Sequence, residues 1–314
     1  MKLIRGKHKL SEPSSGCVVT LGNFDGMHLG HQALLRELNT MSESLNLPSV
    51  LITFEPQPKE FFAKRETVPR LMRFCEKWLA LQDYAIDYVL CLRFNHALAS
   101  LTPQAFVQEI LVDQLNAQAV IVGDDFRFGA KRAGDYATLK KLGMHYGFQT
   151  SEVATVVIDG ERVSSTRVRN ALEMGDLAAA KKLLGRSYRL YGKVGYGEQL
   201  GRDLGYPTAN INLHRDLVPV GGVFIIRVYG LGEHPYNGVA NVGTRPTVGG
   251  TRILLEVHLF DFAAEIYGHN LQVEFLHKLR DEERYATLQE LVEQIRQDVV
   301  DARAYFHELQ VAEQ

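Results

Sequence analysis

Four short apolar runs alternate with longer amphipathic stretches in the first half of the chain, and this alternation limits the possible folds more than any other feature. The runs are rich in β-branched residues and apolar at nearly every position, which predicts strands buried on both faces of a parallel sheet. They are Cys17–Leu21, Val50–Phe54, Tyr88–Leu92 and Ala119–Val122. The stretches between them predict helices that cover the sheet, so we expect a doubly wound α/β domain here.

Two helices of this half carry clear end signals. One begins at Pro103, a residue tolerated best in the first turn, and extends to Leu115. Another is predicted over Leu177–Leu184, with Asp176 as its N-cap and Gly185 as its stop. The first compact domain is therefore expected to end near residue 186.

The second half has a different texture. Glycines become frequent after Tyr188, and short runs with alternating polarity predict antiparallel strands. Such spacing favours a barrel or a sandwich. The clearest of these runs are Val223–Tyr229, Leu254–Leu259 and Leu271–Leu276.

The chain ends with a predicted amphipathic helix. Thr287 and Glu290 have the spacing of a capping box at its start. One apolar stripe follows on the helix, formed by Leu288, Leu291, Ile295, Val299 and Phe306.

Length and charge narrow the class of protein. A chain of 314 residues exceeds the usual size of a single hydrophobic core, so we expect two domains, at residues 1–186 and 187–314. The formal net charge is −2, which supplies no general positive field for a nucleic acid or an anionic membrane. Neither nucleic acid nor an obligate protein partner is implied.

Cysteine use and the N-terminus predict a cytoplasmic protein. Cys17, Cys75 and Cys91 are widely spaced, which argues against a disulfide framework or a structural zinc site. We interpret them as reduced thiols that lie mostly in the core. No apolar stretch follows the basic N-terminal residues, and no run is long enough to span a bilayer.

A glycine- and histidine-bearing segment follows the first predicted strand, at the carboxyl edge where open α/β sheets bind ligands. Gly22 and Gly26 permit a tight turn with close backbone approach, and the next helix offers free N–H groups to phosphate. His28 and His31 are three residues apart, so both imidazoles are expected on one helical face. As hydrogen-bond donors they would stabilise charge on an α-phosphate while pyrophosphate leaves. The alternative for a lone histidine is a structural role.

Residues 22–31, Gly-Asn-Phe-Asp-Gly-Met-His-Leu-Gly-His, resemble the His-x-Gly-His signature of nucleotidyltransferases, and more closely the FMN adenylyltransferase module of bacterial FAD synthetases. Residues 54–58, 123–129 and 164–169 agree with that resemblance. It implies an ATP site at Gly22, Asn23, Phe24, Asp25, Gly26, His28, His31, Ser164, Ser165, Thr166 and Arg167. It also implies a flavin side at Phe54, Pro56, Pro58, Phe62, Asp125 and Phe128.

Each of these stretches has a plainer interpretation. Ser164–Arg167 would be an ordinary helix cap, although its hydroxyls and arginine suit the β- and γ-phosphates of ATP. Residues 124–128 would be a strand-end turn with two buried aromatics. Phe54, Pro56, Pro58 and Phe62 would be core residues rather than a wall against the isoalloxazine.

A second glycine-rich segment, residues 192–202, leads into Pro207-Thr208-Ala209-Asn210. It lacks the Gly-Lys-Ser/Thr of a P-loop, but its backbone would wrap phosphates around Gly201 and Arg202. Thr208 and Asn210 bring one hydroxyl and one amide oxygen, which are hard ligands suited to Mg²⁺. The alternative is a turn that opens a strand.

The tetrapeptide and residues 237–247 resemble riboflavin kinases, whose domain is a barrel. The resemblance implies Thr208 and Asn210 beside the ATP phosphates and the metal. In the predicted strand Leu254–Leu259, the apolar residues at 255, 257 and 259 share one face, and Glu256 and His258 share the other. A glutamate on such a face is usually only solvated. The resemblance implies instead that Glu256 is the base for the sugar-chain hydroxyl.

Together the two motif sets predict a bifunctional enzyme with riboflavin, FMN and ATP as substrates and Mg²⁺ as the ion that accompanies ATP. A synthetase-like nucleotidyltransferase with an unrelated barrel is a rival, but the sequence has no Lys-Met-Ser-Lys-Ser segment. A flavin or nucleotide sensor, or an RNA-binding barrel, is another. The net charge opposes RNA binding, and the presence of Glu256 with Thr208 and Asn210 opposes an inactive sensor.

Overall fold

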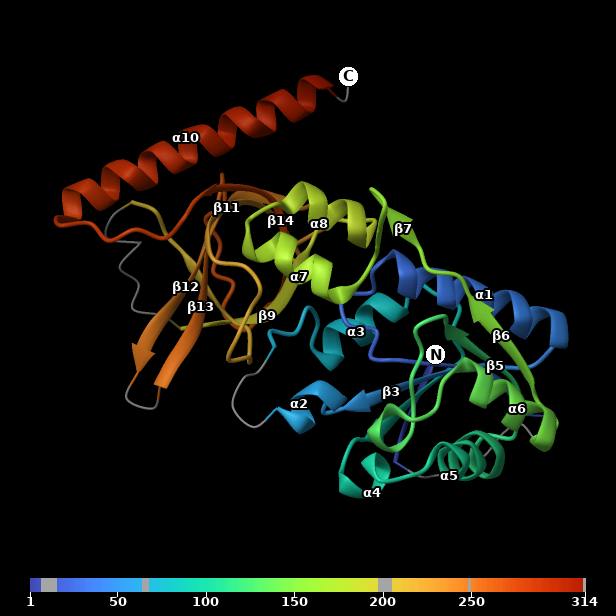
Figure 1. The fold of residues 1–314 in the computed structure, drawn as a ribbon. Coiled ribbons are helices and arrows are strands. Elements are labelled where there is room, and N and C mark those ends of the chain that lie inside the picture. The colour runs from blue at the N-terminus through green and yellow to red at the C-terminus, as the bar shows by residue number, and fades with distance from the viewer. Residues whose placement is uncertain (7–15, 64–67, 197–204, 248–249, 313–314) are drawn as a thin grey trace. The chain divides into compact units, whose positions relative to one another are not determined.

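The computed structural model describes residues 1–6, 16–63, 68–196, 205–247 and 250–312, which form two compact units (Figure 1). The first comprises Met1–Val68 and Met72–Ser165, and the second Pro69–Leu71 and Thr166–Gln314. The chain thus changes unit after Ser165, while the boundary at residue 186 stays a prediction. The intervening helices, α7 (Ser165–Glu173) and α8 (Leu177–Leu184), fall almost wholly in the second unit.

The first unit contains the predicted parallel sheet, with all four predicted strands present. Its six strands are in the order β1-β4-β3-β2-β5-β6, and every neighbouring pair is parallel. Their bounds are β1 Lys2–Arg5, β2 Cys17–Leu21, β3 Ser49–Glu55, β4 Tyr88–Arg93, β5 Ala117–Gly123 and β6 Gln149–Val153. The two edge strands, β1 and β6, were not predicted, because one is very short and the other is largely polar.

Successive residues of the central strands supply two separate cores, one on each face of the sheet. Val19 and Val120 belong to one core, and Val18 and Ile121 to the other. The helices that cover the two faces are α1 (Leu29–Leu45) and α3 (Phe74–Leu81) on one, and α5 (Pro103–Phe106), η1 (Val107–Gln114) and α6 (Tyr136–Tyr146) on the other. This double covering confirms the doubly wound class. The remaining short elements are α2 (Pro58–Phe62), α4 (His96–Ala99), η2 (Ala130–Arg132), β7 (Val157–Ile158) and β8 (Glu161–Arg162).

The helix predicted over Pro103–Leu115 has the expected extent, but it changes from one helix type to another along its length. It begins as an α-helix with Thr102 as its cap and continues as the π-helix η1 from Val107. Sequence spacing cannot distinguish these two windings, because Val107, Ile110 and Leu111 are buried at intervals that suit an α-helix.

The second unit contains a closed antiparallel barrel in the order β10-β13-β12-β11-β14-β9. The strands are β9 Arg189–Gly195, β10 Ala209–Asn212, β11 Gly222–Tyr229, β12 Tyr236–Thr247, β13 Gly250–Leu259 and β14 Asn270–Arg280. On β13, Leu255 and Val257 are fully buried, whereas Glu256 and His258 are half-buried. The predicted alternation of this strand is therefore confirmed.

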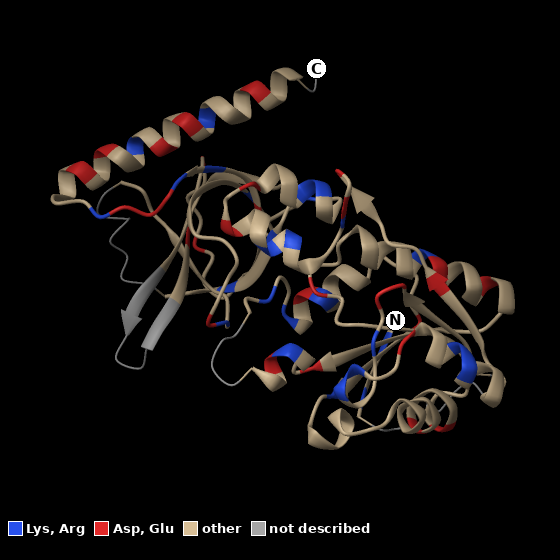
Figure 2. Ribbon diagram, in the orientation of Figure 1, with Lys and Arg blue, Asp and Glu red and all other residues tan. Residues whose placement is uncertain are grey.

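Helix α10 (Leu288–Ala312) packs on the outside of the barrel. Ala302 and Phe306 are buried with Ile225, Val239 and Phe260, and Val299 packs against this cluster. The predicted capping box forms, because Glu290 N donates to Thr287 Oγ1 at 3.2 Å and Thr287 N to Glu290 Oε2 at 3.3 Å. Leu288, the first residue of the predicted apolar stripe, is 63% exposed, because the apolar contact begins farther along the helix. Charged residues line much of the helix (Figure 2).

The cysteines only partly follow the prediction. Cys17 is buried in the first unit, and burial raises the pKa of its thiol to about 12. Cys91 is half-buried and Cys75 is exposed, so the expectation of mostly core thiols is wrong for Cys75. Cys75 lies near the start of α3, on the side of that helix that the sheet does not cover.

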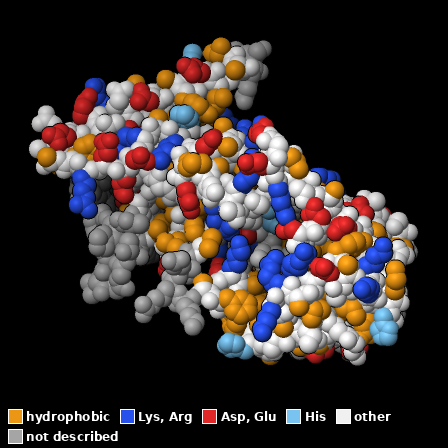
Figure 3. Space-filling view, viewed as in Figure 1, with side chains coloured by type: hydrophobic (Ala, Val, Ile, Leu, Met, Phe, Trp, Pro, Cys, Tyr) orange, Lys and Arg blue, Asp and Glu red, His pale blue; other side chains and the backbone are white. Residues whose placement is uncertain are grey.

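Acidic and basic side chains are interspersed on the face visible in Figure 3. In the part of the chain that the structure describes, no helix combines the length and the apolar character needed to cross a bilayer.

Candidate active sites

The turn after β2 is held in place by its own apolar side chains. Phe24 and Met27 have positive φ angles of 48° and 50°, and both side chains are buried in the core of the first unit. Gly22 N donates to Ile52 O on β3 at 3.1 Å. Phe24 is fully buried, so its ring packs in the core and does not face a nucleotide.

Asp25 joins this turn to the second predicted motif. Its carboxylate accepts from Met72 N at 3.0 Å, and its carbonyl accepts from Ser165 Oγ at 2.9 Å. Asp25 is 2% exposed, so its side chain fixes the turn rather than facing a ligand. The structure thus brings Ser165 to the glycine–histidine segment. Ser164 is half-buried beside it, whereas Thr166 and Arg167, exposed and half-buried, belong to the second unit.

His28 and His31 form a stacked pair at the start of α1. His28 is the N-cap, and its Nδ1 accepts from His31 N at 3.3 Å. The two rings lie 3.7 Å apart with an interplanar angle of 17°. Because Nδ1 of His28 accepts, its Nε2 carries the proton in the neutral ring and can donate to a ligand. Gly30 leaves room for the His28 ring, since a Cβ there would lie 3.2 Å from that ring and would require a small shift of it.

The surroundings of His31 favour its neutral form. Burial, and then electrostatic interactions with His28, Lys77 and Arg162, hold the pKa of His31 well below its usual value. Its Nδ1 is buried and has no hydrogen-bond partner among the described residues. A neutral imidazole can donate to phosphate without transferring its proton.

Lys77 is a buried cation beside this motif. It lies on α3, is 1% exposed, and its Nζ donates to Thr53 Oγ1 at 3.1 Å. Thr53 Oγ1 in turn donates to Asn23 O at 3.5 Å, so the bonds run from α3 through β3 to the turn. The sequence analysis missed Lys77, because a lysine inside an amphipathic helix predicts only a solvated face. The available signal was its helical spacing from Phe74 and Leu81, three residues before it and four after, on the apolar side of α3.

The predicted flavin wall is part of a larger aromatic cluster at the ends of β3 and β4. Phe54 and Phe62 both contact Phe94, with ring centroids 5.9 and 5.8 Å apart, and Phe62 is 62% exposed. Phe61 and His96 join the cluster and were missed by the sequence analysis. Pro56 is exposed and Pro58 half-buried at the start of α2. Phe62 is thus not the core residue that the alternative required.

The other two predicted flavin residues have separate surroundings. Asp125 is exposed and forms an ion pair with Arg162. Phe128 is buried, and its ring lies 5.3 Å from Phe126 and 5.9 Å from Phe106. Phe128 therefore packs in the core of the first unit, and its ring neighbours in the described structure are these two phenylalanines rather than Phe62.

In the barrel, three polar residues from three strands form a row. Glu256 on β13 lies directly opposite Asn210 on β10 and directly opposite Asn241 on β12. Directly opposed residues in antiparallel strands point to the same face, with Cβ atoms about 5 Å apart. The row Asn210–Glu256–Asn241 therefore lies on the outer, half-buried face of the barrel.

The Pro-Thr-x-Asn segment is fixed against the same strand. His258 Nδ1 donates to Pro207 O at 2.9 Å, and the His258 ring lies 5.6 Å from Tyr206. Thr208, which is exposed, lies between this contact and Asn210. Gly201 and Arg202 lie outside the described residues.

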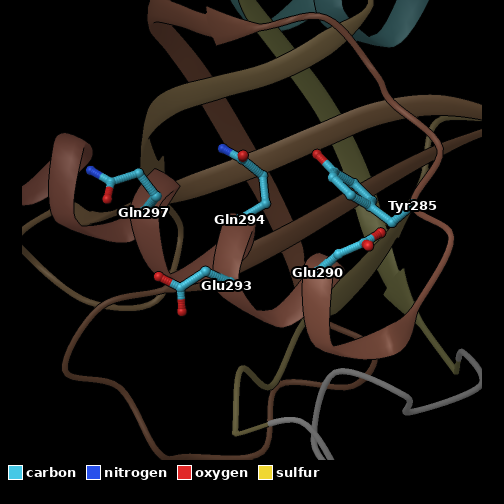
Figure 4. Close-up of a pocket in the computed structure, with 5 residues that line it drawn as sticks. All are labelled: Tyr285, Glu290, Glu293, Gln294 and Gln297. Atoms are coloured by element: carbon cyan, nitrogen blue, oxygen red, sulfur yellow. The ribbon is translucent and has the colours of Figure 1, made fainter.

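A pocket of about 480 Å³ lies along the first half of α10. Figure 4 shows its lining: four side chains from α10 and one tyrosine from the segment before it, namely Tyr285, Glu290, Glu293, Gln294 and Gln297. None of the predicted site residues that the structure describes is in that lining, so we assign no substrate to it.

A parallel sheet with a histidine-bearing turn at its carboxyl edge, followed by a barrel with a carboxylate between two amides, defines a two-domain nucleotide-dependent transferase. Residues 10–167 match the family model of FAD synthetase, and residues 184–306 match that of riboflavin kinase. The chain belongs to the bifunctional riboflavin kinase/FMN adenylyltransferase family, with the two domains in the predicted order.

Individual relatives support this membership over nearly the whole chain. A protein of Escherichia coli (strain K12) named bifunctional riboflavin kinase/FMN adenylyltransferase is 50% identical over 307 residues, covering 98% of both chains. Its namesake from Haemophilus influenzae is 43% identical and covers 98% of this chain and 100% of its own. A crystal structure described as a macrolide-efflux protein from Streptococcus pneumoniae has a TM-score of 0.83 at 32% identity, over 94% of this chain and 97% of that one.

Proposed function

We propose that the barrel unit transfers the γ-phosphoryl group of ATP to the terminal side-chain hydroxyl of riboflavin, with Glu256 as the general base. The observation that carries this proposal is the row Asn210–Glu256–Asn241, which sets a carboxylate between two amides on the outer face of the barrel. Glu256 accepts the hydroxyl proton, the hydroxyl oxygen bonds to the γ-phosphorus, and the bond from that phosphorus to ADP breaks. The products are FMN and ADP.

Thr208 and Asn210 are the proposed protein ligands of the Mg²⁺ that accompanies ATP. In the described part of the chain no group of three or more His, Cys, Asp or Glu could hold a metal ion. This fits Mg²⁺, which usually keeps several waters and takes its other ligands from substrate phosphates. The hydroxyl of Thr208 and the amide oxygen of Asn210 are hard neutral ligands of the kind it accepts. When bound, the ion neutralises charge on the transferring phosphoryl group.

For the α/β unit we propose adenylyl transfer from a second ATP to FMN. A phosphate oxygen of FMN attacks the α-phosphorus of ATP, and the bond to pyrophosphate breaks. His28 and His31 donate hydrogen bonds to the charge that develops there, and the N-terminus of α1 presents backbone N–H groups to the phosphates. Ser164, Ser165, Thr166 and Arg167 are the proposed contacts for the leaving phosphates. Phe54, Pro56, Pro58, Phe62, Asp125 and Phe128 remain the proposed flavin side.

The proposed substrates are riboflavin, FMN and ATP, and the proposed location is the cytoplasm. A single assay tests the division of work between the units: the full chain is incubated with riboflavin, ATP and Mg²⁺, and the flavins are separated by chromatography. The parent should accumulate FMN and FAD. His31→Ala should stop at FMN, whereas Glu256→Gln should make FAD only when FMN is supplied. If one variant loses both reactions, or if the parent makes no FAD, the proposed assignment is wrong.

A further inference from the structure

Asn241 lies next to the proposed base but has no role in the proposal so far. It is opposite Glu256 in the β12–β13 ladder, as Asn210 is in the β10–β13 ladder. Asn210 is already proposed as a ligand of Mg²⁺. The question is therefore what the amide on the other side of Glu256 binds.

The orientation of the Asn241 amide follows from its neighbour Glu282. Asn241 Nδ2 donates to Glu282 Oε1 at 3.4 Å. A carboxylate only accepts, so the nitrogen must face Glu282 and the amide oxygen must face away from it. The position of Glu282 is itself narrow, because its carboxylate fills the space that a side chain at Gly243 would occupy.

The amide oxygen of Asn241 is a buried acceptor for which the described residues supply no donor. Oδ1 has no hydrogen-bond partner among the described residues, although it is shielded from solvent. A buried polar atom in a native structure normally has a partner, and leaving it unpaired is unfavourable. The neighbouring Glu256 carboxylate cannot supply one, because it too is an acceptor when it acts as a base.

Two acceptors side by side suit a ligand with two neighbouring hydroxyl groups. Cβ atoms of opposed residues are about 5 Å apart, so a vicinal diol can donate one hydroxyl to each side chain. We propose that Asn241 Oδ1 accepts a hydrogen bond from the side-chain hydroxyl of riboflavin next to the reacting one. This inference rests on the proposed function, since it takes Glu256 as the partner of the reacting hydroxyl. It makes Asn241 a residue that selects a polyol chain.

The test combines a protein change with a substrate change. We would measure kcat/KM at saturating Mg·ATP for riboflavin and for analogues that each lack one inner side-chain hydroxyl. In the parent, loss of the hydroxyl beside the reacting one should lower kcat/KM by about 10- to 100-fold, because Oδ1 is then left unpaired. Asn241→Leu should lower kcat/KM for riboflavin by a similar factor. In the Asn241→Leu variant, kcat/KM for that same analogue should be within about twofold of kcat/KM for riboflavin.

Two controls isolate the contact. Asn237→Leu removes an asparagine from the same strand that is opposite Arg227 rather than Glu256, and it should leave the analogue ratios of the parent unchanged. The KM for ATP should stay within about twofold in Asn241→Leu, since a contact to the polyol does not touch ATP. If Asn241→Leu does not fold, the ratios of kcat/KM between riboflavin and each analogue are measured in Asn241→Ser. In this variant, loss of the hydroxyl beside the reacting one should lower kcat/KM by less than in the parent.

Equal penalties for every analogue in the parent and the Asn241 variants would overturn the proposal. A changed pH profile without coupling to any hydroxyl would also overturn it, because Asn241 would then act on Glu256 and not on the substrate. The base assignment fails separately: if Glu256→Gln phosphorylates riboflavin at the parent rate, Glu256 is not the base, whatever the analogue ratios are.

Discussion

The two units build their candidate sites in different ways. In the α/β unit, the turn and the two histidines proposed to act on the α-phosphate lie in one short continuous segment, residues 22–31, whose backbone is fixed by buried side chains such as Phe24 and Met27. In the barrel, the site is a row of side chains that strand pairing brings together from residues 210, 241 and 256. A continuous segment can be recognised in the sequence as a motif. The row can be recognised only when the pairing register of the strands is known. A substitution in one of these two sites should therefore lower only the reaction of its own unit and leave the reaction of the other unit unchanged.

The largest effect is expected for Glu256→Gln. The glutamine keeps the shape of the side chain but cannot accept the hydroxyl proton, so riboflavin phosphorylation should fall by about 10²- to 10⁴-fold. Because the transition state of phosphoryl transfer is loose, a loss near the lower end is expected. FAD formation from supplied FMN should be unchanged. Activity within about threefold of the parent would exclude the base role, and loss of Mg·ATP binding would make the role one of positioning.

Substitution of a histidine should have the next largest effect, on the other reaction. His28→Ala or His31→Ala removes one preorganised donor from the adenylyl-transfer site, and FAD formation should fall by about 10²- to 10³-fold. Riboflavin phosphorylation by the same chain is the internal control. Full retention of FAD formation would assign both histidines a structural role.

The fragment boundary sharpens the comparison further. Helix α8 contacts β14, so a barrel fragment that starts at residue 187 loses a covering that a fragment from residue 166 keeps. The shorter fragment should be less stable by about 2 to 4 kcal/mol, the scale of burying one or two leucine side chains. Urea unfolding followed by circular dichroism measures this difference. Equal stability of the two fragments would favour the predicted boundary at residue 186.

The smallest effect is expected for Lys77→Met, which removes a buried charge while keeping the stem of the side chain. The positive charge of Lys77 lowers the pKa of His31, so its removal should raise that pKa toward the ordinary value. Burial, His28 and Arg162 still act, so the pKa of His31 should stay below its usual range. FAD formation should fall by about 10-fold, or about 1.4 kcal/mol of barrier.

NMR titration of the His31 imidazole in the parent and in Lys77→Met measures the shift directly. Lys77→Arg serves as the matched control, because it retains the charge. An unchanged His31 pKa in Lys77→Met would limit Lys77 to the support of Thr53 and the turn. Riboflavin phosphorylation should be the same in all three proteins.

The sequence predicted both folds and most of the elements, because burial imposes a period on the residues of each strand and helix. What it missed depends on contacts that are distant in the chain. Lys77 looks like a solvated helix residue until β3 provides Thr53, and Leu288 looks like a core residue until α10 is seen to begin its apolar contact later. Asn241 was visible only as part of a resemblance, because its place beside Glu256 is set by the pairing of β12 with β13.

Closure of the barrel also has a consequence for synthesis on the ribosome. Strand β9, the first strand of the barrel to be synthesised, pairs with β14, the last one. One edge of β9 therefore stays unpaired until β14 has been synthesised. The parallel sheet needs nothing beyond β6, which ends at Val153. At ordinary translation rates, the time between synthesis of β6 and synthesis of β14 is of the order of 10 s. During that time the nascent chain carries a sheet that can already be complete, followed by strands with open edges, which are the part most exposed to aggregation and to chaperone binding.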